Sequence, residues 1–321
     1  MHFLNLLVTV LYMLYVQPLF VTGNNNIYPQ PDHALCTGLP MHVVMIGIDG
    51  LTTDGLLRAS TPVIDGLRKN GAWSMQVQPV QPTLSSPNWA SLLTGVLPEV
   101  HGIYKNGWKA PDTGKTTSSN SGYELPVPSL FEILRRQHPH ATTACFYQWQ
   151  DLKRLIEPFA PGRFTHTGNE SMTVNCAARY IKKHKPAFTF LHLDNVDHAG
   201  HIFGYGSKAY IEAIETTDAL LNRIVAAVNK SGMAANTVFI ITTDHGGIDH
   251  NHGGQTPEEC NTPFIICGPG IKKGYAIQNS LQIYDIAPTV AKLLGLQPPA
   301  HWAGNPAMEL FVNHGRLVAA P

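Results

Sequence analysis

The sequence predicts an α/β fold in which helices cover both faces of a mostly parallel central sheet, a three-layer sandwich. Short apolar runs alternate with amphipathic helical patterns along most of the 321-residue chain, as expected where crossover helices join parallel strands. At 44% apolar and 14% charged residues, the composition is typical of a globular protein. Three of the five predicted strands end in aspartate or histidine, and open parallel sheets bind ligands at this edge.

The elements are predicted from these patterns in chain order. Short runs of apolar residues predict strands at His42 to Ile48, Thr143 to Tyr147, Phe188 to Leu193, Thr237 to Thr243 and Pro263 to Cys267. Amphipathic patterns predict helices at Pro62 to Lys69, Trp89 to Thr94, Ser129 to Gln137, Thr173 to Lys183, Ser207 to Asn229 and Ile283 to Leu294. Tyr104 to Tyr123 is too long for a simple connection, and long loops of this kind are often functional.

Charge excludes some function classes. The 22 basic and 22 acidic residues give a formal net charge of zero. A protein that coats nucleic acid or binds an anionic membrane surface carries an excess of basic residues, so neither class is expected. The oligomeric state is left open by the sequence.

The N-terminal segment resembles a secretory signal peptide. Phe3 to Val21 is almost wholly apolar, and the first 31 residues contain no Asp, Glu, Lys or Arg. We predict a signal peptide over residues 1–23, a linker over 24–40, a single domain over 41–321, and secretion. Because the segment lacks a basic start, an uncleaved N-terminal anchor at the cell surface is the alternative.

Two further sequence features bear on the compartment. Asn169 and Asn229 begin N-glycosylation sequons, which fit a secreted glycoprotein. The odd number of cysteines leaves at least one thiol unpaired or intermolecular, and their spacing is not that of a zinc knuckle or redox motif. The cysteines are Cys36, Cys145, Cys176, Cys260 and Cys267.

Aspartates and histidines gather at the predicted strand ends. Taken singly, each has an ordinary explanation as a turn cap, a solvated loop residue or a structural histidine. Together they are enough for two metal ions, and mixed carboxylate and imidazole ligands suit Zn²⁺ better than Ca²⁺ or Mg²⁺. Paired metals stabilise both oxygens of an in-line phosphoryl displacement. The residues are Asp49, Asp197, His201, Asp244, His245 and His252.

A hydroxyl-rich segment, Pro82 to Trp89, precedes an apolar helical pattern. Backbone N–H groups and the helix dipole favour an anion at a helix start, which makes this segment a candidate nucleophile site. A plain N-cap is the alternative explanation.

A series of short motifs follows one order along the chain: Gly47-Ile48-Asp49-Gly50, Thr61 to Leu67, the hydroxyl segment through Gly95, Pro98 to Ile103, Asp197 with Gly200-His201, Thr243 to Gly246, Thr262-Pro263-Phe264, Asp285 to Thr289, and Leu294-Gly295. With these motifs in this order, the chain from about Met41 to Phe311 resembles the type I phosphodiesterase and nucleotide pyrophosphatase family of the alkaline phosphatase superfamily. The resemblance implies an alkaline-phosphatase-like sandwich and a two-zinc hydrolase of phosphodiester or pyrophosphate bonds in a small-molecule or nucleotide substrate.

The resemblance also implies roles for individual residues. One zinc ion takes Asp49, Asp244, His245 and the Ser85 oxygen, and the other takes Asp197, His201 and His252. Ser85 is the nucleophile and forms a phosphoseryl intermediate, with Ser86 and then Thr83 as rivals. Asn106 matches an asparagine that binds a phosphate oxygen.

Other candidates lie beside these positions. Asp194 and His198 are expected to orient the imidazole ligands. Four aromatic residues are candidates for a substrate pocket, although such residues are as often packing: Trp89, Tyr104, Trp108 and Tyr123.

Three departures from the family pattern limit what it implies. Serine replaces threonine at Ser85, which keeps the hydroxyl. Leu84 replaces a lysine common in vertebrate members, and Trp89 replaces a histidine, so substrate choice is not inherited. The segment has no arginine to pair with a dianionic phosphate, which favours a diester over a monoester. A phosphomonoesterase, a sulfatase and an inactive binding relative are the alternatives.

Overall fold

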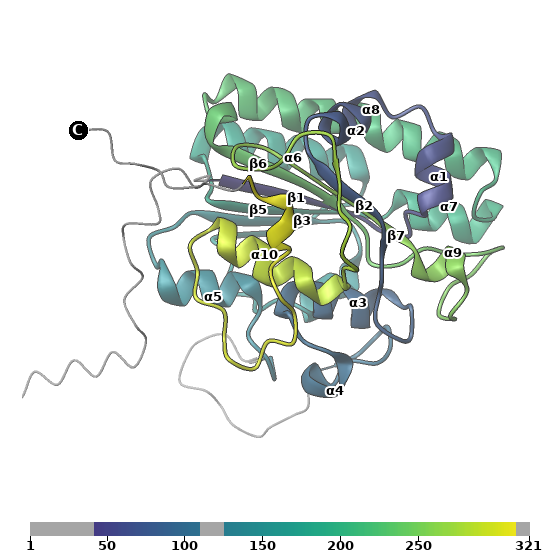
Figure 1. Ribbon diagram of the computed structural model, residues 1–321, viewed down its shortest axis with the longest axis horizontal. Helices are drawn as coiled ribbons and strands as arrows, with labels where there is room; N and C mark the ends of the chain where they lie inside the picture. Colours follow the sequence, from purple (N-terminus) through teal and green to yellow (C-terminus); the bar gives the residue numbers. More distant parts are fainter. Residues whose placement is uncertain (1–41, 110–124, 313–321) are drawn as a thin grey trace, which may run out of the picture. The chain divides into compact units, whose positions relative to one another are not determined.

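The computed structural model describes residues 42–109 and 125–312. Within them, eight strands form one sheet in the order β4-β3-β5-β1-β6-β7-β2-β8. Figure 1 shows this sheet between its helices. The strands are β1 (His42–Ile48), β2 (Ala72–Val77), β3 (Thr143–Tyr147), β4 (Arg163–His166), β5 (Phe188–Leu193), β6 (Thr237–Thr242), β7 (Thr262–Cys267) and β8 (Tyr275–Ala276).

The predicted mostly parallel sheet is confirmed. Strands β4, β3, β5, β1 and β6 pair in parallel, whereas β7 runs antiparallel to both β6 and β2. The prediction missed β2, β4 and β8. Strand β2 buries only alternate residues, β4 is a four-residue edge strand with exposed ends, and β8 has two residues. None of them forms a continuous apolar run.

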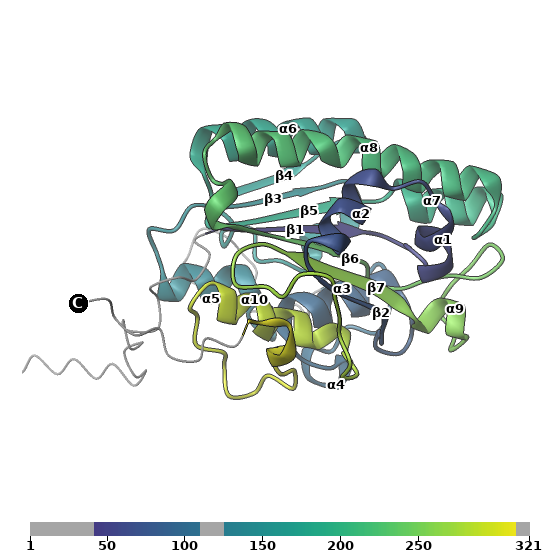
Figure 2. The same cartoon turned by 45° about the horizontal axis from the view of Figure 1, so that its top comes forward.

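Helices cover both faces of the sheet (Figure 2). One face carries α1 (Thr53–Arg58), α2 (Pro62–Lys69), α6 (Glu170–His184), α7 (Asn195–Phe203) and α8 (Lys208–Lys230). The other carries α3 (Ser85–Thr94), α5 (Leu130–Gln137) and α10 (Ile286–Leu293). The short helices α4 (Pro98–His101) and α9 (Pro257–Cys260) complete the α-helical set of the described residues.

Strand β1 lies between β5 and β6 and is buried along its whole length. Val43 and Met45 pack into the core that contains α3 and α5, while Val44 and Ile46 pack into the core that contains α6 and α8. A strand buried on both faces is an unbroken apolar run, which is why its pattern was recognisable. Its carboxyl end places Asp49 between two neighbouring strand ends.

The N-terminal predictions fall outside the described part of the chain. The proposed signal peptide and linker lie there, as do Cys36 and Tyr123. Among residues 42–109 and 125–312, no helix is both long and apolar enough to cross a membrane. The four cysteines in these ranges are free thiols.

Glu170 gives the fold a pH dependence that can be tested. This buried carboxylate accepts hydrogen bonds from Thr217 Oγ1 at 2.8 Å and from Asn195 Nδ2 at 3.1 Å. Burial raises the pKa of Glu170 from 4.5 to about 7. Between these values the folded protein binds the proton that the unfolded chain releases, so this group makes stability fall as pH rises, by about 3 kcal/mol in total.

We expect Glu170→Gln, which resembles the protonated side chain, to remove this part of the pH dependence. Urea unfolding at pH 5 and pH 7.5 would show a smaller loss of unfolding free energy in the variant than in the wild type. Glu212→Gln, at an exposed ion pair with Lys208 on α8, is the matched control and should keep the wild-type difference. Equal pH dependence in Glu170→Gln and the wild type would contradict the assignment.

Candidate metal centre

The predicted metal ligands come together at the carboxyl ends of three adjacent strands. Asp49 directly follows β1, and Asp244 and His245 follow β6. Asp197 lies in the first turn of α7, which begins one residue after Asp194 at the end of β5. The adjacency of β5, β1 and β6 brings these distant segments to one edge of the sheet.

A first cluster surrounds the His245 imidazole. Its Nε2 lies 3.2 Å from Asp244 Oδ2, 3.5 Å from Asp49 Oδ1 and 3.2 Å from Ser85 Oγ. All four side chains are buried. Asp49 Oδ1 and Asp244 Oδ2 are buried without any hydrogen-bond partner. A buried carboxylate oxygen without a donor is costly, and a bound cation would satisfy both atoms.

A second cluster lies beside the first. His201 Nε2 is 3.2 Å from both Asp197 Oδ2 and His252 Nε2, and His252 Nε2 is 3.9 Å from Asp197 Oδ1. Tyr205 donates its hydroxyl hydrogen to Asp197 Oδ1. The His245 and His252 rings stack with their centroids 3.7 Å apart, so the two clusters are in contact.

The three histidines are held in the same way, with Nδ1 against a main-chain carbonyl oxygen. His245 Nδ1 lies 2.8 Å from Gly246 O, His201 Nδ1 lies 2.9 Å from His250 O, and His252 Nδ1 lies 2.8 Å from Thr83 O. A carbonyl only accepts, so each Nδ1 carries a proton, and Nε2 is the nitrogen that has the lone pair when the imidazole is neutral. This is the tautomer that a metal-binding imidazole needs.

The electrostatics of the site also favour a bound cation. Burial raises the pKa of Asp49 and of Asp244 well above the usual range, and the charge of Asp197 raises both further. Burial would also raise the pKa of Asp197, but the His201 hydrogen bond and the charges of His245 and His252 lower it overall. No lysine or arginine of the described residues forms an ion pair with these aspartates.

The donor set therefore fits metal ions. Asp49, Asp244 and His245 each offer a ligand atom within 4.8 Å of the others, and so do Asp197, His245 and His252. The donors are carboxylate oxygens and imidazole nitrogens, the ligand types that zinc accepts.

Ser85 is the first residue of α3, four residues before the predicted start of that helix. The helix start was predicted too far toward the C-terminus because Ser85-Ser86-Pro87-Asn88 lacks the apolar pattern of a helix. Asn88 holds the preceding loop: its Nδ2 donates to the carbonyl oxygens of Val80, Pro82 and Leu84, and its Oδ1 accepts from Val80 N–H at 2.7 Å. These bonds fix the loop from which Ser85 emerges.

Asn106 lies next to this helix start. Its Oδ1 accepts the Ser86 N–H at 2.8 Å, and its exposed amide NH₂ has no partner among the described residues. The Ser85 N–H likewise has no acceptor there. Two donors at the helix N-terminus are thus free for an anionic oxygen.

The aromatic pocket prediction is wrong for Trp89. Its ring is fully buried, packs against Phe190 and His192, and donates Nε1–H to Asp49 Oδ2 at 3.1 Å. Tyr104 is 47% exposed and Trp108 packs partly against the core, and their substrate role stays a prediction.

Asp194 and His198, which were expected to orient the imidazole ligands, form no hydrogen bond to a ligand side chain among the described residues, and His198 is exposed. Burial and the charge of Asp49 raise the pKa of Asp194 to about 7. Main-chain carbonyls hold the imidazoles instead. Sequence reasoning could not identify these carbonyls, because any residue can supply them.

Sequence reasoning also missed His192 and Tyr205. His192 Nε2 lies 3.0 Å from Asp49 Oδ2, and burial lowers the pKa of His192 to about 4. The Tyr205 ring is wedged between α7 and the loop after β6, where a Cβ on Gly200 or Gly247 would come within 2.6 or 2.3 Å of it. The two glycines near a tyrosine were the available signal for this close packing.

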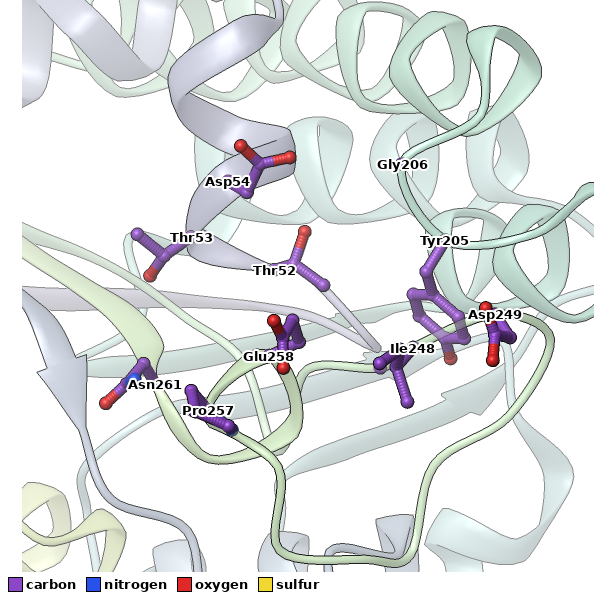
Figure 3. A pocket seen from close by; sticks show the side chains of 11 residues that line it. Thr52, Thr53, Asp54, Tyr205, Gly206, Ile248, Asp249, Pro257, Glu258 and Asn261 are labelled. Atoms are coloured by element: carbon purple, nitrogen blue, oxygen red, sulfur yellow. The ribbon is translucent and has the colours of Figure 1, made fainter.

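A pocket of about 350 Å³ is linked to the second cluster through Tyr205, which lines the pocket and whose hydroxyl binds Asp197. Figure 3 shows its lining residues, which include Thr52 before α1, Ile248 and Asp249 between β6 and α9, and Glu258 on α9. Trp89, Tyr104 and Trp108, the three predicted aromatic pocket residues that the structure describes, are not among its lining residues.

Comparison with known proteins identifies sequence relatives. The family model for type I phosphodiesterase / nucleotide pyrophosphatase matches residues 43–261. GPI ethanolamine phosphate transferase 1 of Yarrowia lipolytica is 25% identical over 263 residues, which cover 72% of this chain and 28% of the relative. Human ectonucleotide pyrophosphatase/phosphodiesterase family member 1 is 26% identical over 208 residues, which cover 61% of this chain and 22% of the relative. The chain thus spans less than a third of the length of either relative.

Solved structures share the fold. Murine ectonucleotide pyrophosphatase / phosphodiesterase 5, as an inactive threonine-to-alanine variant in complex with AMP, matches with a TM-score of 0.72 at 18% identity. The match covers 84% of this chain and all of that one. Alkaline phosphatase PafA and a 2-O GAG sulfatase match with TM-scores of 0.71 and 0.67. The predicted alkaline-phosphatase-like fold is confirmed.

Proposed function

Because the chain belongs to the type I phosphodiesterase / nucleotide pyrophosphatase family, we propose that it is a two-zinc hydrolase of phosphodiester or pyrophosphate bonds. The observation that carries the proposal is the convergence of three imidazole Nε2 atoms, three aspartates and the Ser85 hydroxyl at one sheet edge. We also propose that it is secreted, through a signal peptide over residues 1–23, and that residues 41–321 form one catalytic domain.

The residues divide between two zinc ions as the two clusters do. Asp49, Asp244, His245 and Ser85 Oγ would hold one ion, and Asp197, His201 and His252 the other. Bound zinc supplies Lewis acidity, which lowers the pKa of a coordinated hydroxyl and stabilises negative charge on a leaving oxygen.

Ser85 performs the covalent step. Its Oγ attacks phosphorus in line, so that an Oγ–P bond forms while the bond from phosphorus to the leaving oxygen breaks. Water then cleaves the phosphoseryl ester and restores the hydroxyl. The Ser85 N–H and the Asn106 amide donate to the non-bridging oxygens, where negative charge develops.

The substrate is proposed to be a diester or a dinucleotide-like pyrophosphate. The segment around Ser85 has no arginine to pair with a second phosphate charge, and a neutral asparagine suits a singly charged group. The AMP complex of the murine neighbour supports a nucleotide substrate. A phosphomonoesterase or a sulfatase is the alternative, supported by the neighbouring structures of those classes.

The test is hydrolysis of the bis-, mono- and sulfate esters of p-nitrophenol by the full chain, with zinc and after chelation. We expect the diester to have the highest kcat/KM, and activity to disappear with chelator and return with zinc. Preference for the monoester or the sulfate ester would keep the fold but overturn the substrate class. Inactivity on all three by protein with two bound zinc ions would favour an inactive binding relative.

A further inference from the structure

The Asp49 carboxylate is held on one side by two N–H groups. Oδ2 lies 3.1 Å from Trp89 Nε1 on α3 and 3.0 Å from His192 Nε2 on β5. The three side chains are at most 1% exposed. Trp89 can only donate, and the ionised carboxylate of an Asp49 that binds a cation can only accept, so His192 carries its proton on Nε2 to complete the pair.

The two oxygens of the Asp49 carboxylate thus have different surroundings. Oδ2 has two donors, whereas Oδ1 has no hydrogen-bond partner and lies 3.5 Å from His245 Nε2 in the first cluster. Tilting the carboxylate out of this orientation would move its free oxygen away from the cluster and leave two buried donors unpaired, which is costly. The donors thus hold the carboxylate with one oxygen toward the metal position.

The packing around Trp89 places its ring beside Asp49. Gly47 on β1 leaves space for the ring, because a Cβ there would lie 2.3 Å from it. The Trp89 and His192 rings pack edge to face, with centroids 5.0 Å apart. Trp89 is also one helical turn after Ser85 on α3, so a single side chain connects the nucleophile helix to a metal ligand.

We propose that Trp89 and His192 are positioning residues that aim Asp49 Oδ1 at the first metal position. The inference rests on the proposed two-zinc function but concerns metal binding, not the reaction. Partners that orient a metal ligand typically change metal affinity by about 10- to 100-fold. We expect loss of either donor to weaken one zinc site by that factor and to leave the Asp197, His201 and His252 site unchanged.

The experiment compares variants of the full chain that differ in their donors. Trp89→Phe keeps an aromatic ring but loses the N–H. His192→Phe loses the donor, and His192→Gln restores an N–H group. Phe190→Leu is the packing control, because Phe190 contacts the Trp89 ring, 5.7 Å between centroids, without a hydrogen bond to Asp49.

Zinc content at a series of buffered free zinc concentrations is the readout, with circular dichroism to check folding. Trp89→Phe and His192→Phe should bind one of two zinc ions 10- to 100-fold more weakly, while His192→Gln should recover part of the loss. Phe190→Leu should bind both ions as the wild type does. If His192→Phe fails to fold, the comparison of Trp89→Phe with Phe190→Leu still shows whether loss of a donor to Asp49 weakens zinc binding.

Three results would overturn the proposal. Unchanged zinc binding in folded Trp89→Phe would exclude a positioning role for its N–H. An equal loss in Phe190→Leu would show that packing alone matters. Three zinc ions in the wild type and two in His192→Phe would make His192 a ligand itself, since Asp49, His192 and Asp194 offer atoms within 4.8 Å of one another. Failure of ester hydrolysis with these zinc effects intact would affect only the proposed function.

Discussion

Ser85→Ala is expected to lower kcat for diester hydrolysis by at least about 10³-fold while the protein keeps both zinc ions. Ser85 Oγ is the hydroxyl oxygen 3.2 Å from His245 Nε2, at the start of α3 and beside the two free donors of the helix N-terminus. Without it no covalent intermediate forms. Zinc remains, because three aspartates and three histidines still supply ligands. Steady-state kinetics and metal analysis on the same sample check both parts.

Ser86→Ala is the matched control, since it removes a buried hydroxyl from the adjacent residue. The Ser86 contact with Asn106 is made by its backbone N–H, which the substitution keeps. We expect activity within a few-fold of the wild type, and mass spectrometry of quenched wild-type reactions should find the phosphoryl group on Ser85. A large loss in Ser86→Ala together with an active Ser85→Ala would move the nucleophile to Ser86.

The sequence predicted the parts of the fold that local pattern encodes. Strands β1, β3 and β5 are unbroken apolar runs, and their bounds agree with the prediction. The antiparallel direction of β7 could not be predicted, because an apolar run has the same pattern in either direction. Helix α7 was missed because Asn195, Asp197, His198 and His201 interrupt its apolar residues.

The site shows the same division between local and tertiary information. Asp49 and Asp244 were recognisable because parallel strands end at one edge of the sheet. His192 was not, because it lies inside the apolar run of β5 and has the pattern of a strand residue. Its contact with Asp49 depends on the pairing of β5 with β1, and the contact of Trp89 with Asp49 depends on how α3 packs on the sheet. No local pattern specifies either.

Asp244→Asn is expected to abolish zinc binding at the first site and to stabilise the metal-free protein. Asp244 Oδ1 accepts the Gly50 N–H at 3.2 Å, and an asparagine oxygen can keep that bond. The new NH₂ would replace the unpartnered Oδ2, 3.2 Å from His245 Nε2, and could donate to that lone pair. The variant satisfies the buried position of Oδ2 without a cation and removes a carboxylate ligand from the first site.

The substitution is expected to change the free energy of unfolding in opposite directions in the metal-free and the zinc-bound protein. In metal-free protein at pH 7.5, burial and the charge of Asp197 disfavour the Asp244 anion, and Oδ2 has no hydrogen-bond partner, so Asp244→Asn should raise the free energy of unfolding by about 1 to 3 kcal/mol. With excess zinc the order should reverse, because binding at 1,000 times the dissociation constant adds about 4 kcal/mol to the wild type and the variant loses that contribution at one site. Asp54→Asn, at an exposed ion pair with Arg58, should change neither form. Denaturant unfolding of the wild type and the two variants, with chelator and with zinc, measures all six values. If Asp244→Asn is less stable than the wild type in chelator, Asp244 serves the fold rather than the metal.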